Sequence, residues 1–142
     1  MSPPPREPRS PHPHHTLRVA AVQPRSENGD PDGNLARAAA LAEEAAAKGA
    51  LLILFPELLR AGYDLSPALW TFAEPSKGGA TERWLKQLCA SLNVFAGTTF
   101  LEARAGHFYN TFIMCGPRGS VGRSRKSRPA SFEAFLTAGD EW

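Results

Sequence analysis

Apolar and polar positions along the chain predict alternating strands and helices. Residues Leu51 to Phe55 are five consecutive large apolar residues, a pattern typical of a strand that is covered on both faces. Pro56 follows directly, removes an N–H donor and keeps Phe55 extended, so the strand is expected to end there. Glu57 would then lie at the open end of the strand, and carboxylates at such strand ends are often catalytic in α/β proteins.

The segment around this strand reads as one βαβ unit. Residues 17–23 predict a strand, and residues 24–33, rich in Asn, Gly, Asp and Pro, predict a loop. Residues 34–48 are rich in alanine and predict a helix, with Gly49 placed where a C-terminal cap is expected. The strand at 51–55 completes the unit, whose crossover should be right-handed.

Strands and helices continue to alternate after residue 55. The predicted elements are a loop through 62–64 and Pro67, a helix at 81–92 with Trp84, Leu85, Leu88 and Leu92 on its core face, strands at 94–100 and 108–115, a turn at 116–119, and a short strand at 120–126. Helices and strands in this order predict an α/β layered fold with a mixed sheet.

Composition limits the classes of protein to consider. The chain of 142 residues is 42% hydrophobic and 21% charged, enough for one domain with a modest core. Its two cysteines, Cys89 and Cys115, make no disulfide framework and read as small buried hydrophobes, so a reducing cytoplasm is expected. No apolar run approaches about 18 residues and no signal core is present, which predicts neither a membrane span nor secretion.

The two ends differ from the middle of the chain. Residues 1–16 are rich in proline and histidine and predict a disordered tail, whose histidines at 12, 14 and 15 would bind metal only adventitiously. We expect no metal or organic cofactor, because the Gly78-Gly79 pair lacks the context of a phosphate loop. Near the other end, large apolar side chains arrive with no later element to cover them, so domain 17–142 looks unfinished: Phe132, Phe135, Leu136 and Trp142.

Three charged residues stand in a recognisable order. Glu57 follows Phe55-Pro56 and precedes Gly62-Tyr63, Lys126 ends the stretch Gly122 to Lys126, and Glu133 lies in Phe132 to Phe135 before Gly139-Asp140. Together with Gln23 after the first strand and Asn34 at the head of the first helix, this order resembles the nitrilase superfamily of carbon–nitrogen hydrolases from about Leu17 onward.

The resemblance implies an αββα-sandwich fold and a specific chemistry. In that family a cysteine thiolate attacks an amide or nitrile carbon, a glutamate acts as general base and a lysine stabilises the tetrahedral intermediate. The base maps onto Glu57, the lysine onto Lys126, and a supporting glutamate onto Glu133. The nucleophile should lie a few tens of residues beyond the lysine, but this chain ends 16 residues after Lys126. Neither Cys89 nor Cys115 has the expected place.

We therefore expect the N-terminal half of such a hydrolase, inactive alone, which would act on a small-molecule amide or nitrile if completed. One alternative is a non-catalytic interaction module that forms a homo-oligomer, or pairs with a full-length relative, through its uncovered face. A second is nucleic-acid binding through the basic cluster at Arg118, Arg123, Arg125, Lys126 and Arg128. The net charge of +2 is too small to favour nucleic acid, and alternating charges on a strand more often form a solvated face.

Overall fold

The computed structural model describes residues 16–63 and 66–139. In chain order the elements are β1 (Val19–Ala21), α1 (Pro31–Ala47), β2 (Leu52–Leu54), the 3-10 helix η1 (Pro67–Phe72), β3 (Glu74–Pro75), α2 (Ala80–Leu92), β4 (Phe95–Arg104), β5 (His107–Gly116), β6 (Gly119–Arg125) and the 3-10 helix η2 (Ser131–Glu133). The predicted tail, apart from Thr16, lies outside the described residues, as does Trp142. No helix within the described ranges is both long enough and apolar enough to span a membrane.

Local chemistry explains where the elements begin and end. Helix α1 starts three residues before the predicted position 34, because the Asp30 side chain accepts a hydrogen bond from the Gly33 N–H and Pro31 occupies the first turn. Strands β4 and β5 extend beyond their predicted bounds, since a tight turn at Ala105 and Gly106, with φ of 50° and 79°, lets them pair as far as Arg104 and His107. The two 3-10 helices and β3 were not predicted.

The sheet is mixed, as the sequence predicts. Its main strand order is β1-β2-β4-β5-β6, and β3 also pairs with β4. Strands β1, β2 and β4 run parallel, whereas β4, β5 and β6 are antiparallel. The antiparallel part places Asn110 opposite Leu101 of β4, and the Lys126 N–H donates to the Asn110 carbonyl immediately after β6. This register brings the polar side chains of Asn110 and Lys126 next to the end of β2.

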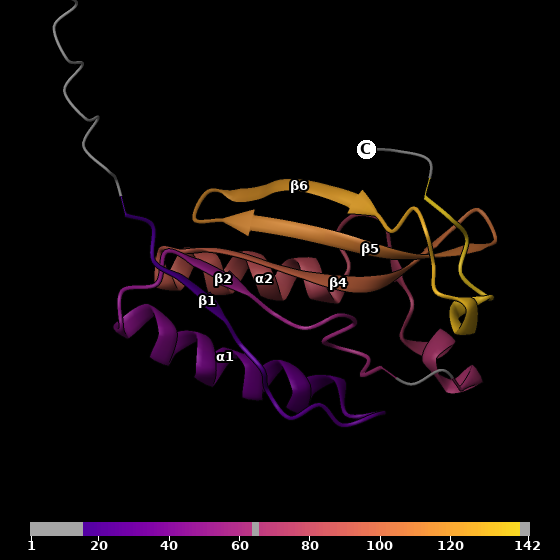
Figure 1. Cartoon of the computed structure of the whole chain (residues 1–142), viewed down its shortest axis with the longest axis horizontal. Coiled ribbons are helices and arrows are strands. Elements are labelled where there is room, and N and C mark those ends of the chain that lie inside the picture. Colours follow the sequence, from indigo (N-terminus) through magenta and orange to yellow (C-terminus); the bar gives the residue numbers. More distant parts are fainter. Residues whose placement is uncertain (1–15, 64–65, 140–142) are drawn as a thin grey trace, which may run out of the picture.

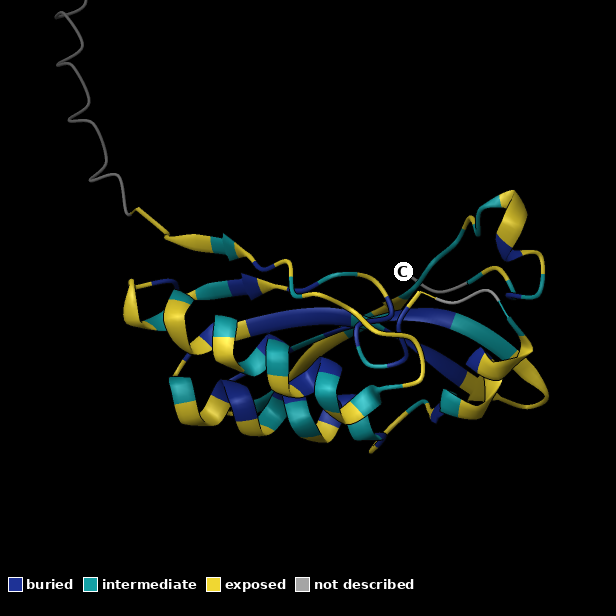
Figure 2. Ribbon diagram, turned by 90° about the horizontal axis from the view of Figure 1, so that it is seen from below, coloured by how far each residue is buried: buried dark blue, intermediate teal, exposed yellow. Residues whose placement is uncertain are grey.

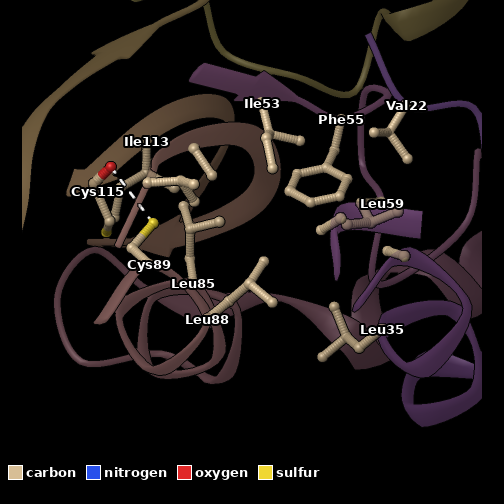
Figure 3. Close-up of a cluster of buried hydrophobic side chains, with 14 of the residues drawn as sticks. Val22, Leu35, Ile53, Phe55, Leu59, Leu85, Leu88, Cys89, Ile113 and Cys115 are labelled. Carbon is tan, nitrogen blue, oxygen red and sulfur yellow. Dashed lines mark hydrogen bonds between the residues drawn. The ribbon is translucent and has the colours of Figure 1, made fainter. Parts of the chain in front are cut away.

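Both α-helices lie on the same side of the sheet (Figures 1 and 2). The main hydrophobic core fills the space between them and the strands. Figure 3 shows Ile53 and Phe55 facing Leu85 and Leu88 of α2, with Leu35 of α1 completing the cluster. The Phe55 and Trp84 rings lie 5.4 Å apart between their centroids, which joins the end of β2 to α2.

The opposite side of the sheet is open over β1, β2 and the start of β4. Val19 is 59% exposed, Leu54 41% and Phe95 47%, although each alternates with a neighbour that packs under the helices. The expectation that strand 51–55 is covered on both faces is therefore wrong for this chain: Ile53 is fully buried but Leu54 is not. The apolar run does form the strand, but over β1 and β2 the described residues cover only the helix side of the sheet.

A second, smaller core covers part of that open side near the ends of β4 and β5. It contains Leu58, Leu69, Leu101 and Leu136, with Phe135 packed against it. The expectation that Leu136 and Phe135 lack cover is thus wrong, because the loop after β2 and helix η1 pack on them. Of the predicted uncovered residues that the structure describes, Phe132 alone is strongly exposed, at 59%.

Candidate active site

The backbone around Glu57 is fixed by the neighbouring strand β4. The Thr98 hydroxyl donates to the Pro56 carbonyl at 2.8 Å, and the Leu58 N–H donates to the Thr99 hydroxyl at 2.8 Å. Both groups that flank Glu57 therefore have partners on β4. This arrangement holds the carboxylate at the end of β2, as the Pro56 signal predicts.

Leu58 has a left-handed backbone, with φ of 49°. This conformation is uncommon for a residue other than glycine and costs roughly 1 kcal/mol or more. Its side chain is 1% exposed in the smaller core, and the Gly62 N–H donates to its carbonyl. Burial and hydrogen bonding hold a strained residue directly beside the candidate base.

Lys126 bridges two carboxylates that are distant in sequence. Its Nζ lies 3.0 Å from Glu57 Oε1 and 2.9 Å from Glu133 Oε2. Glu133 lies in η2 and is fully buried, and the Ala130 N–H and the Tyr63 hydroxyl also donate to its two oxygens. The structure therefore brings together all three predicted site residues, Glu57, Lys126 and Glu133.

The contacts fix the charges of this cluster. Burial opposes ionisation of Glu133, but hydrogen bonds from Lys126, the Ala130 N–H and Tyr63 outweigh it and lower the pKa of the carboxyl. Partial burial likewise opposes the charged form of Lys126, yet its bonds to Glu133 and Glu57 raise the pKa of the ammonium. Lys126 is thus a stable cation at neutral pH, suited to stabilise negative charge and not to abstract a proton.

Sequence reasoning missed Asn110. This residue is 2% exposed, and its Nδ2 donates to Glu57 Oε1 at 2.5 Å. Its Oδ1 is buried and has no hydrogen-bond partner in the described part of the chain. An amide inside a largely apolar and aromatic strand was the available signal, because a buried polar side chain requires a partner. Asn110 and Lys126 together fix one oxygen of Glu57, while Oε2 receives no hydrogen bond from a described residue.

Neither cysteine belongs to this cluster. Cys89 and Cys115 are both fully buried under the helices, and the Cys89 thiol donates to the Cys115 carbonyl (Figure 3). Burial and then the neighbouring Cys115 raise the pKa of Cys89 to about 11. Burial also raises the pKa of Cys115, so both thiols stay protonated near neutral pH. Cys115 shares a face of β5 with Thr111, opposite to Asn110, which agrees with the prediction that both are buried hydrophobes.

The two central residues of the basic cluster, Arg123 and Arg125, do not form a solvated face. Arg125 forms two hydrogen bonds with the buried Glu102, and Arg123 donates to Glu82 of α2. Their side chains are 10% and 27% exposed. The expectation of a solvated face is wrong for these two residues, because buried carboxylates on β4 and α2 pair with them.

The chain is similar to several known proteins. The family model described as carbon-nitrogen hydrolase matches residues 18–139. The nitrilase of Pyrococcus abyssi is 30% identical over 112 residues, which cover 78% of this chain and 43% of that protein. The mouse omega-amidase NIT2 is 32% identical over 106 residues, covering 75% of this chain and 38% of its own length.

A solved structure gives the same fold. Nit3 of Saccharomyces cerevisiae, a member of branch 10 of the nitrilase superfamily, superposes with a TM-score of 0.78 at 23% identity. The superposition covers 88% of this chain and 49% of that one. The chain thus spans about half the length, or less, of the relatives that it matches.

The Tyr63–Glu133 contact makes a spectroscopic prediction. Burial, the hydrogen bond to Glu133 and the charges of Glu133 and Glu57 raise the pKa of Tyr63 to about 12, against an opposing effect of Lys126. Glu133→Gln should lower this pKa toward 10, because it removes the charge that penalises the phenolate. The titration follows phenolate absorbance in a Tyr109→Phe background, which leaves Tyr63 as the one tyrosine.

Circular dichroism at each pH confirms that the chain stays folded during this titration. The matched control is Glu44→Gln on the solvent side of α1, which should leave the pKa of Tyr63 unchanged. An equal pKa in the Glu133 variant and in the parent would show that the contact does not form.

Proposed function

Because the chain belongs to the carbon–nitrogen hydrolase family, we propose that it supplies the base and the electrostatic part of an active site that hydrolyses an amide or nitrile. The observation on which this proposal depends is that one ammonium, Lys126, contacts both Glu57 and Glu133. Taken singly, each of these residues has an ordinary structural explanation. A single cation in contact with carboxylates from separate segments is what we expect of a charge-stabilising lysine that has a base and a supporting glutamate beside it.

Glu57 is the proposed general base. It is the more exposed of the two carboxylates, with 38% of its side chain accessible against 1% for Glu133. Its Oε1 is held by Asn110 and Lys126, which leaves Oε2 to accept a proton from an attacking thiol or water. A fixed base of this kind typically contributes 10²–10⁴-fold to rate.

Lys126 is the proposed stabiliser of the negative charge that develops on the substrate oxygen or nitrogen. The elevated pKa of the ammonium keeps it charged through the reaction. Glu133 is the proposed positioning residue, because it is buried and its oxygens receive hydrogen bonds from three separate groups. It aims the lysine and maintains its charge.

The nucleophile in this proposal is a thiolate from the half of the fold that these residues do not include. Cys89 and Cys115 are the only cysteines of the sequence, and both are buried on the helix side of the sheet with elevated pKa values. We propose that the 142-residue chain alone does not turn over substrate. A linear amide is the proposed substrate class, and a cytoplasmic location is consistent with the free thiols.

A second candidate function is association through the open side of the sheet. Exposed apolar side chains gather there from adjacent strands at Val19, Leu54 and Phe95. Contiguous apolar surface of this kind marks interaction sites or causes aggregation. The chain would then form a homo-oligomer, or pair with a full-length relative, without catalysing a reaction.

The catalytic proposal is tested in a chimera that joins residues 17–139 to the remaining half of the Pyrococcus abyssi nitrilase. We expect the chimera to hydrolyse a linear amide, and Glu57→Gln to lower kcat/KM by roughly 100-fold or more, because it keeps the shape of the side chain and removes the base. Lys126→Ala should cause a loss of similar size. Glu44→Gln, an exposed change on α1, should leave the rate unaltered.

Two outcomes would contradict the catalytic assignment. One is full activity of the Glu57→Gln chimera with an unchanged circular dichroism spectrum. The other is amide hydrolysis by the unmodified 142-residue chain that Glu57→Gln abolishes, since that would require a nucleophile within this chain.

The association proposal is tested by sedimentation velocity over a range of concentrations. We expect a concentration-dependent oligomer whose formation Leu54→Lys suppresses, because the change places a charge in the apolar patch. Ala36→Lys on the exposed side of α1 adds the same charge elsewhere and should leave association intact. A monomer at every concentration, with no binding of a hydrophobic dye, would rule out this role.

A further inference from the structure

A cavity of about 570 Å³ lies on the side of the sheet opposite to the Glu57–Lys126–Glu133 cluster. Residues of β4, β5 and β6 and of the segment before α2 line it. Alternation along β6 places Arg123 and Arg125 on this side, whereas the Lys126 side chain contacts Glu57 on the other side, as Asn110 does. The volume of the cavity falls within the range of roughly 300–1,000 Å³ that is usual for small-molecule sites.

The cavity is strongly basic. The lining contains one carboxylate, Glu102, and four cationic residues: Lys77, Arg104, Arg123 and Arg125. Arg125 donates two hydrogen bonds to Glu102. Lys77 and Arg104 are exposed, and neither forms an ion pair with a residue in the described ranges. Lys77 thus brings a positive charge to the cavity wall without a carboxylate partner there, whereas the charge of Arg104 also acts on Glu102.

Arg123 provides a more specific indication. Its Nη2 donates to Glu82 at 3.3 Å, but its Nη1 is buried and has no hydrogen-bond partner among the described residues. Buried donors are nearly always satisfied, so an unpaired guanidinium nitrogen beside a polar cavity calls for an acceptor. Guanidinium groups match the oxygens of phosphate in geometry and charge.

The start of α2 does not account for this charge. The Thr81 N–H donates to Glu74, and the Gly78 N–H donates to Glu82. Carboxylates therefore already occupy one backbone donor of the first turn, that of Thr81, and the Gly78 donor just before the helix. The attraction for an anion comes from the side chains, and Ser76 in the lining adds a hydroxyl donor.

We propose that this cavity binds a small molecule that bears a phosphate monoester. The doubly charged phosphate group would neutralise Lys77 and Arg104, and one of its oxygens would accept the hydrogen bond of Arg123 Nη1. The cavity is larger than inorganic phosphate needs, so the remaining volume accommodates the organic part of the ligand. This site is independent of the proposed hydrolytic chemistry, because no residue is shared between the two.

Isothermal titration calorimetry of the full 142-residue chain with ribose 5-phosphate tests the proposal, and ribose serves as the uncharged probe. We expect saturable binding of ribose 5-phosphate at near-physiological salt and none of ribose. Arg123→Gln should weaken the affinity roughly tenfold or more, as expected for the loss of a charge-assisted hydrogen bond. Arg118→Gln removes the same charge from the exposed β5–β6 turn and should change the affinity by less than about twofold.

Arg123 also pairs with Glu82, so a second variant protects the test against unfolding. Lys77→Gln alters an exposed lining residue and should weaken ribose 5-phosphate binding several-fold, whereas Lys48→Gln at the end of α1 should not. Absence of saturable binding would overturn the proposal. So would an equal loss in the Arg118 and Arg123 variants, since that would indicate attraction to net charge alone.

Discussion

The register of the antiparallel strands β4, β5 and β6 is the constraint on which the candidate active site depends. The tight turn at Ala105 and Gly106 fixes β5 against β4, and this pairing sets Asn110 beside the end of β2. The Lys126 N–H then bonds to the Asn110 carbonyl, which delivers the ammonium to Glu57. A shift of one residue would turn Asn110 and Lys126 to the helix side, where the buried core and Glu102 lie.

The two sides of the sheet have different roles. Helices α1 and α2 cover one side and enclose the main core and both cysteines. The basic cavity lies on the same side, where β4, β5, β6 and the segment before α2 line it. The other side holds the Glu57–Lys126–Glu133 cluster, which the loop after β2 and η2 complete, and it leaves Val19, Leu54 and Phe95 exposed. In the family fold proposed for the complete enzyme, a second sheet would cover these apolar residues and bring the thiol toward Glu57.

Features with a local cause could be predicted from the sequence. Pro56 ends β2 and places Glu57, and the alanine-rich segment and the leucines of α2 repeat at helical spacing. The burial of Leu136 and the hydrogen bond from Asn110 to Glu57 could not, because both depend on contacts between segments distant in sequence. The apolar run at 51–55 indicated cover on both faces, which local pattern cannot distinguish from cover that another layer must supply.

A double-mutant cycle on Lys126 and Glu133 tests the central claim most directly. The free energy of unfolding of the chain is measured by urea denaturation for the parent, Lys126→Met, Glu133→Gln and the double variant. Direct contact in one network predicts a coupling energy of about 0.5–3 kcal/mol. A coupling energy near zero, with all four proteins folded, would show that Lys126 and η2 do not meet in this way, and the active-site assignment would fail.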